Sequence, residues 1–167
     1  MKKRAFLICS VRKRRKSLLR RFLEFVGLFV NWEQREQAAV RDYVNKLETD
    51  GYEVHWPLRD TDQNDPVGLR ICLDNLRAIA YICSEDTKTA AREKCDARNE
   101  VHIWWNPDSE GSRFDFGMAF AIFFLLNRIE RIVLANREAV RKLVEEENKR
   151  GIGKSFNKVL LELGKWR

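Results

Sequence analysis

The sequence predicts an α/β fold in which parallel strands alternate with helices. Four short, mainly apolar runs are typical of buried strands; they lie at residues 4–10, 52–56, 101–105 and 131–135. Between and after them, apolar residues recur at helical spacing. Strands that alternate with helices along the chain form a parallel sheet with right-handed crossovers. The length of 167 residues fits one domain, which we expect to span residues 1–167.

Six helical segments are expected from the spacing of apolar residues. They lie at residues 11–31, 32–50, 67–82, 113–127, 136–150 and 156–166. The first of them, which begins basic and continues apolar, is a helical insertion after the first strand. Gly51 ends the second helix. Residues 59–66 and 106–112 are expected to be loops, and the polar residues 83–99 are either a helical extension or an inserted excursion.

The charge of the chain is concentrated at its N-terminal end. The formal net charge is +7, but residues 1–21 hold ten basic residues and no acidic one, which leaves the rest of the chain at −3. A polymeric nucleic acid is therefore not the expected partner of the body of the domain. The basic, apolar residues 12–30 fit a membrane surface, a subunit interface or a lid over a site, and we expect a homo-oligomer formed through their apolar face.

Several classes of protein are excluded by the pattern. No apolar run approaches the roughly 20 residues of a membrane span, and residues 5–9 are too short for a signal peptide. The four cysteines form no CxxC pair, so we expect free thiols in a cytoplasmic protein and no metal site. His55 and His102 lie within predicted strands, where a hydrogen-bonded sheet histidine is the simpler interpretation.

The richest segment follows the third predicted strand and reads NPDSEGSRFDFGMA over residues 106–119. It carries three carboxylates (Asp108, Glu110 and Asp115) beside a glycine and a serine at the expected start of a helix. Ser112 is the expected N-cap, and backbone N–H groups at such a start favour an anion or a sugar oxygen. Asp115 lies between two phenylalanines, and an acid that compensates the helix dipole is the alternative interpretation of it.

This segment resembles the signature of the nucleoside 2-deoxyribosyltransferase family and its N-glycosidase relatives. The signature is a Gly-Ser or Gly-Thr turn followed by a carboxylate, an apolar residue, Gly, any residue and Ala. The matching residues here are Gly111, Ser112, Asp115, Phe116, Gly117, Met118 and Ala119. The first strand RAFLICS and the segment LDNLRAI, in which Asp74 matches an inward-facing family Asp, agree in order.

The resemblance implies a flavodoxin-like sheet of four or five strands and chemistry at an N-glycosidic bond. In the family, the signature carboxylate attacks C1′ of the sugar, the base departs, and a second base or water then takes the sugar. This implies Asp115 as nucleophile or oxocarbenium stabiliser, with Asp74 and Asp108 as acid/base candidates. The family's usual nucleophile is Glu, and Asp is one methylene shorter, or about 1.5 Å. Glu110 is the alternative carboxylate.

The remaining site residues are expected around a nucleoside or nucleotide. They are Ser10, Arg12, Asp60, Asn64, Glu110, Ser112 and Met118. Arg12 and Ser112 suit a 5′-phosphate, and no cofactor is expected for this chemistry. Two alternatives remain open: a non-catalytic nucleotide-binding or partner-binding module on the same fold, and an enzyme that cleaves a dinucleotide such as NAD.

Overall fold

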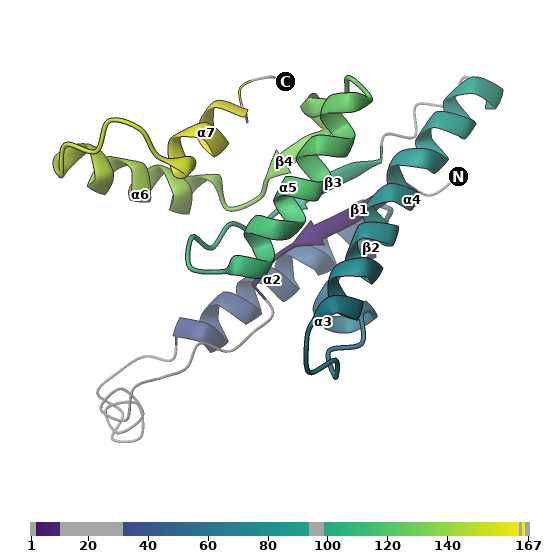
Figure 1. The fold of residues 1–167 in the computed structure, drawn as a ribbon, viewed down its shortest axis with the longest axis horizontal. Helices are drawn as coiled ribbons and strands as arrows, with labels where there is room; N and C mark the ends of the chain where they lie inside the picture. Colours follow the sequence, from purple (N-terminus) through teal and green to yellow (C-terminus); the bar gives the residue numbers. More distant parts are fainter. Residues whose placement is uncertain (1–2, 11–31, 94–98, 164, 166–167) are drawn as a thin grey trace.

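The computed structural model describes residues 3–10, 32–93, 99–163 and 165, shown in colour in Figure 1. The helical insertion predicted at 11–31 lies outside the described residues. Within the described part, four parallel strands form one sheet in the order β2-β1-β3-β4. The strands are β1 (Lys3–Ile8), β2 (Tyr52–His55), β3 (Glu100–Ile103) and β4 (Ile132–Leu134). This confirms the α/β fold, and the order is that of flavodoxin-like sheets.

Helices cover both faces of the sheet. They are α2 (Trp32–Thr49), α3 (Pro57–Asp60), α4 (Leu69–Glu93), α5 (Glu110–Leu125), α6 (Arg137–Lys149) and α7 (Phe156–Leu163). Helices α4 and α5 pack side by side on one face, α2 packs on the other, and α6 and α7 lie beside β4 (Figure 1). Gly51 follows α2 with a positive φ of 89°, as expected for the residue that ends that helix.

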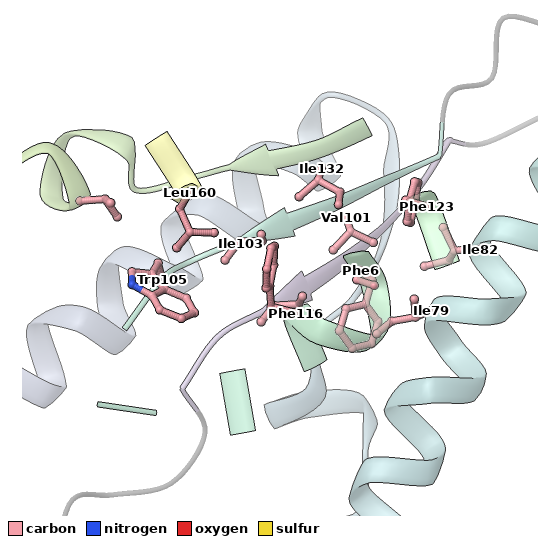
Figure 2. Packing of buried hydrophobic residues seen from close by; sticks show 13 residues of the cluster. Phe6, Ile79, Ile82, Val101, Ile103, Trp105, Phe116, Phe123, Ile132 and Leu160 are labelled. Atoms are coloured by element: carbon pink, nitrogen blue, oxygen red, sulfur yellow. The ribbon is translucent and has the colours of Figure 1, made fainter. Parts of the chain in front are cut away.

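The core has two layers, one on each side of the sheet. Figure 2 shows the larger layer, in which side chains of β1, β3 and β4 meet those of α4, α5 and α7. Phe6 and Ile103 of the sheet are almost completely buried there against Ile79 and Phe116 of the helices. The smaller layer joins β1 and β2 to α2 through residues such as Leu7 and Val44. Because β1 is buried on both faces, it reads as a continuous apolar run in the sequence.

Two element boundaries differ from the sequence prediction, and the structure decides between the two alternatives for the start of 83–99. The loop expected at 59–66 begins inside α3, which starts at Pro57. Helix α4 continues to Glu93, so residues 83–93 form the helical extension, which was one of the two alternatives for 83–99. Helix α5 begins at Glu110 rather than at residue 113, because Ser109 and not Ser112 is its N-cap.

The inward face of α4 matches the sequence prediction only in part, because the apolar spacing predicts one stripe made of Leu69, Cys72, Leu73, Leu76 and Ile79. Leu69 and Leu73 are exposed, with 61% and 41% of their surface accessible. The buried positions within residues 69–82 are Asn75, Ile79 and Ile82, of which Ile79 belongs to the predicted stripe. A polar side chain at one inward position breaks the apolar period, so the spacing of the leucines pointed to the wrong face.

Within the described ranges, no helix is both long enough and apolar enough to cross a membrane.

Candidate functional site

A cavity of about 500 Å³ lies beyond the carboxyl ends of β1 and β3. In the sheet order β2-β1-β3-β4, this is where the chain changes direction between neighbouring strands, and such points are the usual ligand sites of open α/β sheets. The lining residues come from the end of β1, the loop before α4, α4 itself, the loop after β3 and the start of α5. They are Cys9, Ser10, Gln63, Gly68, Ile71, Cys72, Asn75, Asn106, Asp108, Ser109, Glu110, Gly111, Phe114 and Asp115. The volume suits a nucleoside-sized ligand.

The start of α5 places two of its carboxylates at the cavity. The Ser109 hydroxyl accepts a hydrogen bond from the Ser112 backbone N–H at 3.2 Å and another from the Ser112 hydroxyl at 2.9 Å. This cap fixes where the helix begins. Glu110 then stands in the first turn and Asp115 in the second. Side chains of a helix tilt toward its N-terminus, so Asp115 reaches back toward the cavity.

Asp115 is the buried carboxyl group of this site, with 6% of its surface exposed. Its Oδ2 accepts a hydrogen bond of 3.0 Å from Nδ2 of Asn75, its hydrogen-bond partner among the described residues. Burial raises the pKa of Asp115 to about 6, although the hydrogen bond from Asn75 opposes that rise. At neutral pH the carboxyl group is therefore mostly ionised and still close to its titration range, which suits a group that must exchange bonds.

A chain of hydrogen bonds continues from Asn75 away from the cavity. The Thr61 hydroxyl donates to Oδ1 of Asn75 at 3.1 Å, and Nε2 of His55 lies 3.2 Å from the same hydroxyl. The His55 ring stacks on Phe6 with 5.1 Å between ring centroids. Thr61 and Asn75 are both buried. The orientation of the Asp115 carboxylate is therefore linked to β2, from which His55 comes.

Two further carboxylates line the same cavity. Asp108 lies in a turn in which its backbone N–H donates to Oδ1 of Asn106 at 3.0 Å, and Glu110 begins α5. Both side chains are exposed, unlike that of Asp115. The cavity thus combines one buried and two solvated carboxyl groups, and such a difference in environment is what separates the roles of paired acids.

Cys9 contributes a buried thiol to the wall of the same cavity. Burial raises the pKa of its thiol to about 12, so it stays protonated and is a poor nucleophile. Of these two buried groups, Asp115 is therefore the one that is mostly ionised at neutral pH.

The structure brings together four of the predicted site residues: Ser10, Asp108, Glu110 and Asp115 all line the cavity. Ser112 is buried behind it, where its hydroxyl supports the cap of α5. Arg12 lies outside the described residues.

Four predicted residues lie away from the cavity. Asp74 is on the outer side of α4 and pairs with Arg77 at 3.0 Å. Asp60 accepts a 2.7 Å hydrogen bond from the Trp56 backbone N–H and borders a second cavity of about 320 Å³. Asn64 is exposed, and Met118 packs against the larger core layer.

The sequence interpretation missed Asn75, which is the residue that contacts Asp115. It is the neighbour of Asp74, and on a helix adjacent residues point about 100° apart, so the choice between them depends on which face is inward. The spacing of Asn75 to Ile79 and Ile82 was the available signal, because both of these are buried.

No group of three or more His, Cys, Asp or Glu side chains is arranged to hold a metal ion, as far as the described residues go. Comparison of the chain with protein-family models, with curated proteins and with solved structures finds no match.

Proposed function

We propose that this chain acts on the N-glycosidic bond of a nucleoside or nucleotide, in the manner of the nucleoside 2-deoxyribosyltransferases, with Asp115 as the nucleophile. The observation that carries the proposal is the setting of Asp115. It is a buried carboxylate with a pKa of about 6 in the wall of a nucleoside-sized cavity. The cavity lies where open α/β sheets bind their ligands.

The reaction proceeds in two displacements at C1′ of the sugar. An oxygen of Asp115 forms a bond to C1′ as the C1′–N bond to the base breaks, and the bonding electrons leave with the base nitrogen. The product of this step is a glycosyl ester of Asp115. Water or a second base then attacks C1′, and the ester oxygen of Asp115 leaves as the carboxylate.

The departing base needs a proton, and we assign its delivery to the two solvated carboxyl groups. Asp108 and Glu110 line the same cavity as Asp115. In its protonated form, either could donate to the base nitrogen in the first step and take a proton from water or from the incoming base in the second. We favour these two over Asp74, which pairs with Arg77 outside the cavity.

The difference in length between Asp and the family's Glu sets a condition on the substrate. Asp115 reaches about 1.5 Å less far, so the sugar must approach α5 more closely than in the family. Glu110 is the longer carboxylate of the same cavity. It is the alternative nucleophile, and the experiment must separate the two.

The test is base release from a panel of ribonucleosides, 2′-deoxynucleosides, their 5′-monophosphates and NAD, followed by chromatography. We expect wild-type protein to release a base from at least one class. Asp115→Asn should lower that rate by at least a thousandfold, because the amide cannot form the ester. Asp42→Asn, which neutralises an exposed carboxylate on α2, is the matched control and should retain the wild-type rate.

Three results would contradict the proposal. Full activity in Asp115→Asn with loss in Glu110→Gln would assign the nucleophile to Glu110. Binding of a nucleoside without turnover by wild type would favour the non-catalytic module. A panel that is neither bound nor cleaved would remove the nucleoside interpretation altogether.

A further inference from the structure

The hydrogen-bond chain behind Asp115 has a definite direction. A threonine hydroxyl has one proton, and that of Thr61 is donated to Oδ1 of Asn75 at 3.1 Å. The hydroxyl oxygen must then be the acceptor from Nε2 of His55, which lies at 3.2 Å. The His55 ring is therefore the tautomer that carries its proton on Nε2.

This direction determines which end of the Asn75 amide faces Asp115. Because Oδ1 is held by Thr61, the NH₂ group points toward Oδ2 of Asp115 at 3.0 Å. A reversed amide would place its carbonyl oxygen against the carboxylate, where two acceptors repel each other. The ionised form of Asp115 is therefore favoured only in the orientation that Thr61 imposes.

We propose that His55, Thr61 and Asn75 are positioning residues for Asp115: together they lock the Asn75 amide with its NH₂ group on Oδ2 and leave Oδ1 for the substrate. The inference rests on the function proposed above, because the ionised carboxylate is the form that attacks. Thr61 and Asn75 keep respectively 6% and 3% of their surface exposed, so water does not replace these bonds. His55 comes from β2, Thr61 directly follows α3 and Asn75 comes from α4, so this arrangement depends on how the three segments pack in the fold.

The charged groups that act on His55, at the far end of the hydrogen-bond chain, are Asp60, Arg59 and Asp74. Burial lowers the pKa of His55, while Asp60 and Asp74 raise it and Arg59 lowers it. At neutral pH the ring is therefore uncharged and can hold the required tautomer. Asp108 and Glu110 line the same cavity as Asp115, and Cys9 lines it from the end of β1.

The direct test is a titration of the Asp115 carboxyl carbon by ¹³C nuclear magnetic resonance, with its signal assigned by its absence in Asp115→Asn. Asn75→Leu should raise the pKa of Asp115 by about one unit or more. Thr61→Val keeps the side-chain shape without the hydroxyl and should raise it by a smaller amount. Thr61→Ser, which keeps the hydroxyl, should leave the pKa of Asp115 at its wild-type value. His55→Phe keeps an aromatic ring beside Phe6 without the donor and should behave like Thr61→Val.

A matched control separates positioning from loss of stability. Asn99→Leu also removes a buried amide, one that is bonded to the Arg4 backbone N–H and the Ile82 carbonyl. It should destabilise the fold and leave the titration of Asp115 unchanged. If Thr61→Val and His55→Phe leave the pKa of Asp115 where it is in wild type, the positioning proposal is overturned.

Kinetics provide a second readout once a substrate is known. A one-unit rise in the pKa of Asp115 from about 6 should lower kcat/KM by about fivefold at pH 6 and by much less at pH 8. A loss that is equal at both pH values would contradict the proposal. If wild type releases no base at all, the proposed function fails, while the titration still decides whether the three residues act on Asp115.

Discussion

The buried carboxyl group of Asp115 opposes folding at neutral pH. Its pKa is about 6 in the folded protein, against a usual value of 3.8, and burial is the main cause. The proton is therefore bound more tightly in the folded state. Its contribution to stability is fully present below about pH 4 and is lost as the pH rises through about 6. A loss of stability caused by one residue with a shifted pKa is typical of functional sites.

Replacing Asp115 with Asn should therefore stabilise the protein. The amide keeps an acceptor for Asn75 and removes the buried charge, so the free energy of unfolding at pH 8 should rise by up to ~3 kcal/mol. Urea denaturation at pH 4, 6 and 8 measures this, and the gain should shrink toward pH 4. An equal or lower stability of Asp115→Asn at pH 8 would contradict the burial of an ionised group. Asp42→Asn should change the stability by less than about 0.5 kcal/mol at any pH.

The sequence indicated Asp115 but not its partners. The position of Asp115 between Phe114 and Phe116 is a local signal in the sequence that singles out this carboxylate. In the structure its carboxyl group is buried. Asn75 lies 40 positions earlier in the chain, and Thr61 and His55 lie earlier still. Contacts at that separation depend on how α4 rotates about its own axis. A single polar residue on the inward face was enough to mislead the prediction of that rotation.

At the scale of the element, α5 depends on how it begins. Its apolar spacing indicated a helix from residue 113, and the structure adds the turn from Glu110 because Ser109 caps it. The sequence contains two serines in that turn, Ser109 and Ser112, and either suits an N-cap. The structure makes Ser109 the cap and buries Ser112 as a donor to it. This shift moves Asp115 from the first turn to the second.

Removing the cap should loosen the start of α5 and with it the cavity wall. Ser109→Ala loses the acceptor for both the backbone and the hydroxyl of Ser112, so we expect a loss of about 1–2 kcal/mol in the free energy of unfolding. Urea denaturation monitored by circular dichroism measures it. Thr49→Ala, which removes an exposed hydroxyl at the end of α2, is the control and should cost less than about 0.5 kcal/mol. If Ser109→Ala leaves the free energy of unfolding unchanged, a group other than Ser109 caps α5.

At the scale of the whole molecule, the alternation of strands and helices was sufficient to predict the parallel sheet. Right-handed crossovers leave few strand orders for four such units, and β2-β1-β3-β4 is one of them. The same rule placed the loops after β1 and β3 at one edge, where the cavity lies. Asp60 and Asn64, which follow β2, were expected at this cavity, but the described residues that line it from that connection are Gln63 and Gly68. The early turn into α3 directs Asp60 to the second cavity instead.

We expect the chain to self-associate. The apolar face predicted within 18–30 lies outside the described residues, but α4 and α5 also expose large apolar side chains. They include Leu69, Leu73, Phe114, Phe124 and Leu125, of which Leu125 is 81% exposed. Light scattering should give a mass above the 19.8 kDa of one chain, and a monomer would contradict the expectation.

A variant shows which face is responsible. Phe124→Arg should lower the mass if the α5 surface is part of the interface, because a buried unpaired charge is unfavourable there. Ala139→Arg adds the same charge to an exposed position of α6 and should leave the mass unchanged. An unchanged mass in Phe124→Arg would assign the interface to another surface.

The covalent step on Asp115 is tested most directly by rapid acid quench of wild-type protein during turnover, followed by peptide mass spectrometry. The digest should contain a peptide that includes Asp115 and carries the additional mass of the sugar. The same peptide from Asp115→Asn should lack it. A sugar attached to Glu110 or Asp108, or turnover at the wild-type rate by Asp115→Asn, would contradict the assignment of Asp115 as the nucleophile.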